Sequence, residues 1–319
     1  MPTYQGTISD DAIWAVDALD NTVFGLGGDD RIETGSGDDV IDGGDGDDTI
    51  TAGSGDDLIR GGAGADTLNG GSGDDVIVVE GFDSINGGSG VDTIDLSGLS
   101  HGVQVNFVPT SSSPAVITNY DGLSHTDDPI VAHITQVESA IGTAFADDFT
   151  ADEAEDAADI VIDGGGGDDT IRVGGGDDVM HGGTGNDSLV SLGGVDTLYG
   201  GEGNDLLYAA GTGAGDVLDG GAGTDQLKAS VHADVLIGGA GVDTVDYGGA
   251  GSVTINIVTG VHTGVAAGDT VVGVERFALS SGADAFTGGA RAEYVRGENG
   301  DDVLNGGGGS DTLLGQNGA

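Results

Sequence analysis

A nine-residue repeat dominates this chain and is most regular between residues 25 and 95. This segment reads GLGGDDRIE, TGSGDDVID, GGDGDDTIT, AGSGDDLIR, GGAGADTLN and GGSGDDVIV, followed by the shortened unit VEGFDSIN and by GGSGVDTID. Position six of each unit is an aspartate, and position eight is an aliphatic residue. Self-similarity at a fixed short period is typical of a stacked repeat architecture, which constrains the fold more strongly than any local propensity.

Each unit divides into a six-residue loop of glycine and aspartate and a three-residue strand. The glycines allow positive φ, so the loop can turn tightly and direct several carbonyl oxygens inward. Together with the carboxylate at position six, these carbonyls form an oxygen-rich ligand set, which is what a hard cation such as calcium prefers. The aliphatic residue at position eight faces inward, because alternate side chains of a strand point to opposite faces.

Stacking follows from the small amount of apolar surface in each unit. Two units form one flattened coil of 18 residues, and each strand pairs with the strand two repeats away, about 4.8 Å per layer. Loops 25–30, 43–48 and 61–66 then line one edge of the stack, and loops 34–39, 52–57 and 70–75 line the other. A cation between adjacent loops on one edge would neutralise both of their carboxylates.

The tandem pattern GGxGxDxUx resembles the RTX, or haemolysin-type calcium-binding, repeat. The resemblance implies an all-β fold, a right-handed parallel β-roll (β-helix or solenoid) with short strand inserts and several calcium ions between stacked loops. The implied calcium ligands are the aspartates at position six, namely Asp30, Asp39, Asp48, Asp57, Asp66, Asp75, Asp92, Asp169, Asp178, Asp187, Asp196, Asp205, Asp216, Asp225, Asp243, Asp302 and Asp311.

Some loops depart from the family pattern. ASVHAD lacks all three glycines, so we do not expect a calcium site at Asp234, whereas SLGGVD, with Asp196, is intermediate. Glu293 replaces the aspartate in GGARAEYVR. For such imperfect loops a spacer without an ion remains an open alternative. A disordered, low-complexity tract is the alternative for the whole repeat, and it fits the calcium-free chain better than the calcium-loaded one.

The charge of the chain limits its partners. The 319 residues include 56 Asp and Glu but only 7 Lys and Arg, which gives a formal net charge of −49. Such acidity argues against binding to nucleic acid or anionic membranes, and it opposes compaction unless cations intervene. The chain has no cysteine, which excludes disulfides and thiol chemistry, and no apolar stretch long enough for a membrane helix.

The repeats fall into blocks separated by inserts. We predict degenerate half-repeats and a cap, containing Trp14, over 1–24, the first roll over 25–95 and an insert over 96–163. A second roll follows over 164–246, a second insert over 247–287 and a truncated third block over 288–319. The inserts are duplicates, because VESAIGTAFADDFT (137–150) aligns with VERFALSSGADAFT (274–287). The turn-rich stretch 111–129 is predicted to be an exposed loop.

No catalytic motif emerges. GLSHG, around Ser100, matches G-x-S-x-G, but a nucleophile elbow requires a strand-to-helix turn, and no helical pattern follows. The histidines form no HExxH pair, and the many adjacent aspartates make any choice of an acid/base couple arbitrary. We therefore interpret the chain as a protein without a catalytic domain of its own.

The resemblance also suggests a biological context. Export of the family in unfolded form, typically by type I secretion, implies an extracellular or cell-surface protein that folds on calcium binding. One hypothesis is a structural or adhesin-type module with a cell-surface or matrix partner. The alternative is the calcium-binding accessory and secretion domain of a secreted protease, lipase or polysaccharide-modifying enzyme. The last residues, GQNGA, open another loop, so we expect a longer natural chain and consider head-to-tail self-association as a weaker hypothesis.

Overall fold

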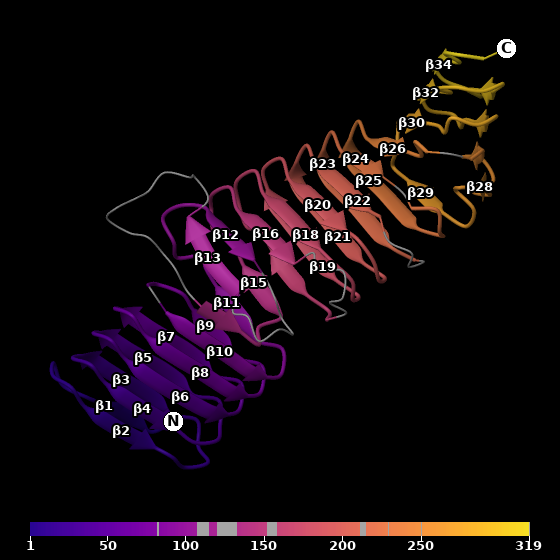
Figure 1. Ribbon diagram of the computed structural model, residues 1–319. Coiled ribbons are helices and arrows are strands. Elements are labelled where there is room, and N and C mark those ends of the chain that lie inside the picture. The colour runs from indigo at the N-terminus through magenta and orange to yellow at the C-terminus, as the bar shows by residue number, and fades with distance from the viewer. Residues whose placement is uncertain are drawn as a thin grey trace. The chain divides into compact units, whose positions relative to one another are not determined.

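The computed structural model describes residues 1–81, 83–106, 115–119, 133–151, 158–210, 215–228, 230–249 and 251–318. Its regular elements are all β-strands, with no helix among these residues and therefore no helix that could cross a membrane. The chain forms two compact units, which we call unit one (1–151 with 160–166) and unit two (152–159 with 167–319). Figure 1 labels the strands.

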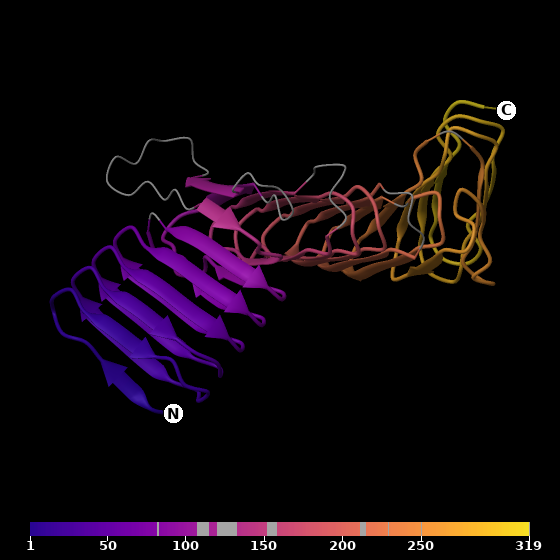
Figure 2. The ribbon, with the colours of Figure 1, turned by 60° about the horizontal axis from the view of Figure 1, so that its bottom comes forward.

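Unit one contains two sheets whose strands alternate along the chain, visible as parallel arrows in Figure 2. Its odd sheet has the order β1 (Thr3–Gln5), β3 (Thr22–Gly27), β5 (Val40–Asp45), β7 (Leu58–Ala63), β9 (Val76–Val78), β11 (Thr93–Asp95), β15 (Ser139–Ile141) and β17 (Val161–Asp163). Its even sheet contains β2 (Ala12–Ala15), β4 (Arg31–Thr34), β6 (Thr49–Ser54), β8 (Thr67–Ser72), β10 (Ser84–Ser89) and β14 (His133–Thr135). These neighbours pair in parallel.

The first insert adds an irregular extension to the even sheet of unit one. Strand β12 (Val103–Asn106) pairs in parallel with β16 (Asp148–Ala151) and antiparallel with β13 (Ala115–Asn119). The prediction of a loop over 111–129 was therefore wrong for 115–119, because residues 116–119 pair with β12. The other residues of that stretch lie outside the described part of the chain.

Unit two repeats the arrangement. Its odd sheet has the order β19 (Val179–Thr184), β21 (Thr197–Gly203), β23 (Val217–Gly223), β25 (Val235–Gly241) and β29 (Thr270–Val272). Its even sheet has the order β18 (Thr170–Val173), β20 (Ser188–Ser191), β22 (Leu206–Ala209), β24 (Gln226–Lys228), β26 (Thr244–Asp246), β30 (Arg276–Ala278), β32 (Tyr294–Arg296) and β34 (Thr312–Leu314). A small third sheet joins β28 (Thr263–Gly264), β27 (Val253–Asn256), β31 (Ala285–Thr287) and β33 (Val303–Asn305).

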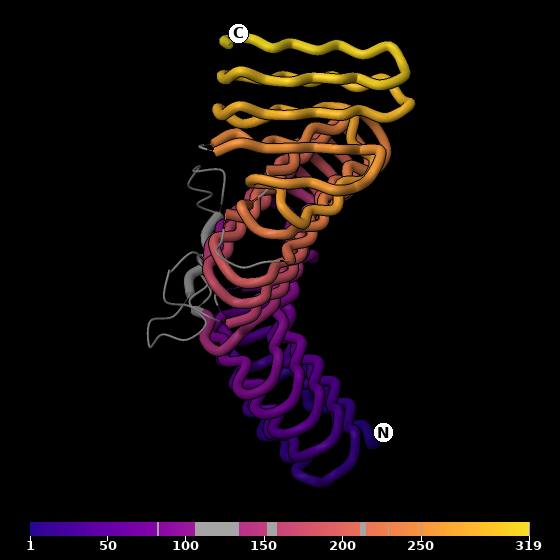
Figure 3. The backbone as a smooth tube through the Cα atoms, turned by 90° about the vertical axis from the view of Figure 1, so that its right-hand side faces the viewer, coloured from indigo at the N-terminus to yellow at the C-terminus, as the bar shows by residue number. Residues whose placement is uncertain are grey.

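The strand register confirms the predicted parallel solenoid with an 18-residue coil. Ile41 of β5 pairs with Ile59 of β7, and Ile50 of β6 pairs with Leu68 of β8, so strands two repeats apart are neighbours. These position-eight side chains are at most 1% exposed and form the core between the two sheets. The coils of each unit therefore stack as flattened loops, as the tube in Figure 3 shows.

Two local features differ from the sequence prediction. Many strands are six residues long, because glycines of the following loop continue the pairing, as Gly44 does with Gly62. Trp14 does not cover the end of the core. It occupies position nine of its unit, in register with Glu33, and is 56% exposed because Ile13 takes the inward position.

Candidate metal centres

The position-six aspartates form hydrogen-bonded ladders along both edges of each stack. The backbone N–H of Asp30 donates to Oδ1 of Asp48 at 2.7 Å, and the N–H of Asp48 donates to Oδ1 of Asp66 at the same distance. In unit two, Asp187 donates to Asp205 in the same way at 2.8 Å. The stacked register thus places each of these carboxylates beside the backbone of the preceding coil and uses one of its two oxygens.

The second oxygen of most of these carboxylates is buried and has no hydrogen-bond partner. A buried, unsatisfied carboxylate oxygen is costly unless a proton or a cation reaches it. Among the described residues such an Oδ2 atom belongs to Asp30, Asp39, Asp48, Asp57, Asp66, Asp75, Asp83, Asp92, Asp187, Asp205, Asp216, Asp225, Asp243, Asp284 and Asp302. These orphaned oxygens fit a row of bound cations.

Carbonyl oxygens surround the same space. A methyl group placed on Gly43 would lie 2.2 Å from Oδ2 of Asp48 and 2.6 Å from the carbonyl oxygen of Gly61. On Gly200 it would lie 2.4 Å from Oδ2 of Asp205 and 2.5 Å from the carbonyl oxygen of Gly220. Glycine at position one therefore leaves open a small space, which we call a cradle. It is lined by the carboxylate of the same loop and by a carbonyl oxygen of the next coil. Oxygen ligands of both kinds suit calcium.

Burial raises the pKa of these carboxyl groups. Desolvation raises the pKa of Asp57 and Asp66 to about 7, and neighbouring aspartates add to the shift. Desolvation likewise raises the pKa of Asp48 and Asp205 to about 6, although backbone N–H groups oppose it. Without a cation these groups take up protons as the pH falls through about 7 to about 6, well above the usual range for aspartate, and protonation then removes the buried charge.

Exposed residues at position five form a second ladder in the opposite direction. The backbone N–H of Asp47 donates to Oδ1 of Asp29 in the preceding coil at 3.0 Å, and Ala65 donates to Asp47 at 2.9 Å. In unit two, Asn204 donates to Asn186 in the same way at 3.0 Å. Our sequence reasoning missed this role and regarded the adjacent aspartates only as carboxylate pairs. The recurrence of Asp or Asn at position five was the available signal.

A different kind of loop carries Ser or Thr at position two. Thr143 donates its backbone N–H to Oδ2 of Asp147 at 2.7 Å and its hydroxyl to Oδ1 at 3.1 Å. Ser230 donates its N–H and its hydroxyl to Oδ2 of Asp234 at 3.1 and 2.9 Å, whereas Oδ1 of Asp234 is buried without a partner. The hydroxyl groups of Thr7 and Ser280 reach Asp11 and Asp284 in the same way. We call these four loops the hydroxyl-capped loops.

The remaining predicted ligands occupy less regular surroundings. Oδ2 of Asp196 accepts a hydrogen bond from the hydroxyl of Ser191, which replaces the first glycine of that loop. Asp169 and Asp178 are buried. The backbone N–H of Asp169 donates to Oδ1 of Asp187, and that of Asp178 donates to Oδ1 of Asp196, as in the rest of the ladder. Asp311 is half-buried and accepts from Glu293 at 3.1 Å.

One ladder of the first repeat block and one of the second end on equivalent glutamates of the duplicated inserts. Oε2 of Glu138 accepts from the N–H of Asp92, and Oε2 of Glu275 accepts from that of Asp243, both at 3.2 Å. Sequence reasoning aligned these glutamates but gave them no role. Because each longer side chain reaches the last aspartate of its block, it terminates the row of carboxylates.

The described residues contain no cluster of three or more His, Cys, Asp or Glu side chains suited to one metal ion. Each site must therefore draw on loop carbonyls as well as on carboxylates from successive coils. Ser100, in the G-x-S-x-G match, lies in a bend after β11, and its hydroxyl is 3.3 Å from Nδ1 of His101. The next element along the chain is strand β12, where a nucleophile elbow leads into a helix.

Stacked parallel coils with carboxylate- and carbonyl-lined loops define a calcium-binding β-solenoid. The model of the RTX calcium-binding nonapeptide repeat matches residues 17–50, 42–77, 80–98, 161–189, 181–211, 210–245 and 280–319. These matches cover more than half of the sequence, so the chain belongs to the RTX repeat family and binds calcium through its repeats.

Curated proteins give no sequence match. Among solved structures, the chain is similar to a hyperactive, Ca²⁺-dependent, β-helical antifreeze protein from an Antarctic bacterium. The identity is 18% and the TM-score 0.33, over 99% of this chain and 81% of the other.

Proposed function

We propose that this protein is an extracellular structural or adhesin-type module that folds when it meets calcium after export in unfolded form, by type I secretion. The supporting observation is the row of buried carboxylate oxygens without partners along the loop edges. A chain with a net charge of −49 must neutralise these groups before its coils can stack. Calcium supplies that charge and completes the oxygen cradles.

The energetic scale supports a switch. Extracellular calcium modules bind with a Kd of about 10⁻⁴ to 10⁻³ M. At a calcium concentration about 100 times Kd, each site stabilises the folded state by about 2.7 kcal/mol. The summed stabilisation from several sites is comparable to, or larger than, the net stability of ordinary domains, which is about 5–15 kcal/mol. Cytosolic calcium, far below Kd, would leave the chain unfolded and competent for export.

A calcium titration followed by far-ultraviolet circular dichroism tests this proposal, with magnesium as the control ion. We expect a cooperative transition from coil to β structure at sub-millimolar to millimolar calcium, reversed by a chelator and not reproduced by magnesium. β structure that persists unchanged in the chelator would overturn the proposal, because the coils would then stand without ions.

A further inference from the structure

Basic residues are rare in this chain but concentrated on one surface. The sequence has 7 Lys and Arg in total, and Arg172, Lys228, Arg276 and Arg296 all lie on the even sheet of unit two. Each occupies position seven or nine of its unit. Both positions flank the buried position eight and therefore face outward. The even sheet of unit two thus carries a positive surface on a strongly acidic molecule.

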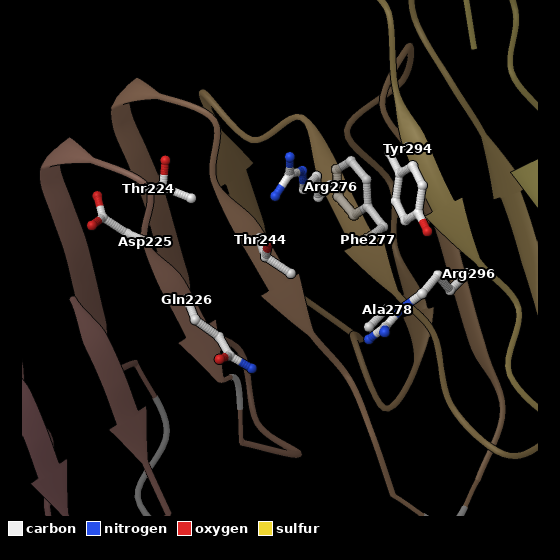
Figure 4. Close-up of a pocket in the computed structure, with 9 residues that line it drawn as sticks. All are labelled: Thr224, Asp225, Gln226, Thr244, Arg276, Phe277, Ala278, Tyr294 and Arg296. Atoms are coloured by element: carbon white, nitrogen blue, oxygen red, sulfur yellow. The ribbon is translucent and has the colours of Figure 1, made fainter. Parts of the chain in front are cut away.

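This surface is hollowed where strands β24, β26, β30 and β32 lie side by side. A cavity of about 660 Å³ opens there, lined by two guanidinium groups, one carboxylate and several neutral residues: Thr224, Asp225, Gln226, Thr244, Arg276, Phe277, Ala278, Tyr294 and Arg296. We call it the arginine groove. Figure 4 shows both guanidinium groups directed toward β26, where Thr244 lies. A smaller hollow of about 280 Å³ shares Ala278 and Arg296 with the arginine groove, and its lining also includes the carboxylates of Asp246 and Glu298.

The register fixes the order of polar groups across the arginine groove. Thr244 pairs with Arg276, and Arg276 pairs with Tyr294, so the guanidinium has a hydroxyl-bearing neighbour on each side. Within the described part of the chain, Arg276 forms no ion pair. The carboxylate of its neighbour Glu275 contacts Arg291 instead, at 3.7 Å. Arg296 contacts Glu298 through Nε at 3.1 Å, which leaves its terminal nitrogens to other partners. The groove therefore offers cationic donors for an anionic ligand.

The remaining chemistry favours a sugar chain over a peptide. The Tyr294 ring is 37% exposed, and Gln226 and Thr244 offer amide and hydroxyl groups for the hydroxyls of a sugar ring. The only large apolar lining residue, Phe277, is 1% exposed and belongs to the core, so the groove lacks the apolar anchor pocket on which peptide binding usually depends. Guanidinium groups bind carboxylate and sulfate through paired hydrogen bonds.

We propose that the arginine groove binds an acidic oligosaccharide, a short chain of sugar rings that carry carboxylate or sulfate groups. This inference goes beyond calcium-coupled folding and rests on the side chains of one sheet face rather than on the loops. It requires unit two to be folded. Circular dichroism of each binding sample at saturating calcium therefore separates a failure of folding from a failure of the groove.

Isothermal titration calorimetry with trigalacturonate, at saturating calcium, tests the proposal. We expect binding to the unmodified chain and to Arg60→Gln, whose side chain pairs with Glu80 at 2.7 Å in unit one. Arg276→Gln and Arg296→Gln should each weaken binding about tenfold, because each removes a charge-assisted hydrogen bond. The neutral trisaccharide galactotriose should bind much more weakly than trigalacturonate.

Three outcomes would overturn the inference. The first is no heat of binding from folded protein with trigalacturonate. The second is unchanged affinity in the folded Arg276→Gln/Arg296→Gln double variant, which would place any binding elsewhere. The third is equal affinity for the peptide triglutamate, which would mean that the groove recognises acidic peptides or charge alone and not the sugar.

Discussion

Each position-six aspartate serves two purposes through its two oxygens. Oδ1 of Asp66 holds the coil register by accepting the N–H of Asp48 at 2.7 Å. Oδ2 of Asp66 faces the cradle over Gly61, where a methyl group would lie 2.3 Å away from it. The aspartate at position five, such as Asp47, takes part only in the exposed ladder. Substitutions at the two positions should therefore separate calcium binding from register.

We predict that Asp66→Asn reduces stability only in calcium. Asparagine keeps an oxygen for the N–H of Asp48 but loses the charge, so we expect a loss of about 1–3 kcal/mol at saturating calcium. The measurement is urea unfolding in calcium at neutral pH and in chelator at about pH 5, where the metal-free chain is expected to fold.

Asp47→Asn is the matched control, because Asn186 and Asn204 already maintain the same exposed ladder in unit two. It should leave stability within about 0.5 kcal/mol of the unmodified chain. Equal effects of the two substitutions in calcium would contradict the assignment of Asp66 as a ligand.

The pKa shifts predict opposite pH responses with and without calcium. Burial raises the pKa of Asp57 and Asp66 to about 7 from 3.8. The folded, metal-free state therefore binds more protons than the unfolded state, and its stability falls as pH rises from about 4 to about 7. Lowering the pH of metal-free protein from about 7.5 to about 5 should increase its β structure, as measured by circular dichroism.

In calcium the protons compete with the metal for the same oxygens. The calcium concentration that half-saturates the sites should therefore rise as the pH falls below about 7, even though protons themselves favour the folded chain. Equal half-saturating calcium concentrations at about pH 7.5 and about pH 5, measured with a calcium-selective electrode, would contradict ligation by these high-pKa carboxylates.

At the scale of the element, the identity of the second loop residue, glycine or a hydroxyl-bearing residue, distinguishes two kinds of turn. Gly44 and Gly62 have φ of 111° and 103°, a region open to glycine, and their loops leave Oδ2 of the aspartate without a partner. Thr143 and Ser230 do not have positive φ, and their N–H groups donate to the carboxylate. The hydroxyl-capped loops thus give the aspartate local donors that the glycine loops lack, although Oδ1 of Asp234 and Oδ2 of Asp284 remain buried without a partner.

Thr143→Val should destabilise unit one by about 1–2 kcal/mol in calcium and in chelator at low pH alike. The substitution removes the hydroxyl that contacts Oδ1 of Asp147 but keeps the shape of the side chain and its N–H. Thermal unfolding under both conditions measures the effect. A loss confined to calcium would show that this loop is itself a metal site.

At the scale of the whole molecule, charge decides the state of the chain. The net charge of −49 is spread along the repeats, and the described residues hold only four exposed or half-exposed Arg–carboxylate pairs to offset it. Exposed pairs of this kind each contribute about 0–1 kcal/mol. Calcium is therefore the main agent that can neutralise the buried carboxylates at neutral pH.

Small-angle X-ray scattering should reveal this dependence directly. A disordered chain of this length has a radius of gyration on the order of 60 Å. We expect a value of that order in chelator at neutral pH and a large, cooperative decrease on calcium addition. Sodium chloride at high concentration should produce only a small decrease, because screening reduces repulsion without filling the cradles. Full contraction by salt alone would contradict the need for a bound ion.

The sequence by itself determined the 18-residue coil, the strand pairing two repeats apart and the identity of the buried aliphatic residues. It could do so because side chains alternate along a strand and because a fixed period forces every unit into the same environment. The calcium-binding family follows from the same pattern, since glycine and aspartate at fixed spacing prescribe an oxygen-lined loop.

Only the tertiary structure decided features that depend on contacts between coils. Stacking of the coils brings Oδ1 of Asp48 to the N–H of Asp30 and the carbonyl oxygen of Gly61 next to Gly43. It also brings Glu138 to Asp92, which is 46 residues away in the sequence. The arginine groove likewise joins residues from four strands that are adjacent only in the sheet. Such contacts are set by the register between coils and by the lengths of the inserts, and neither is encoded within a single nonapeptide.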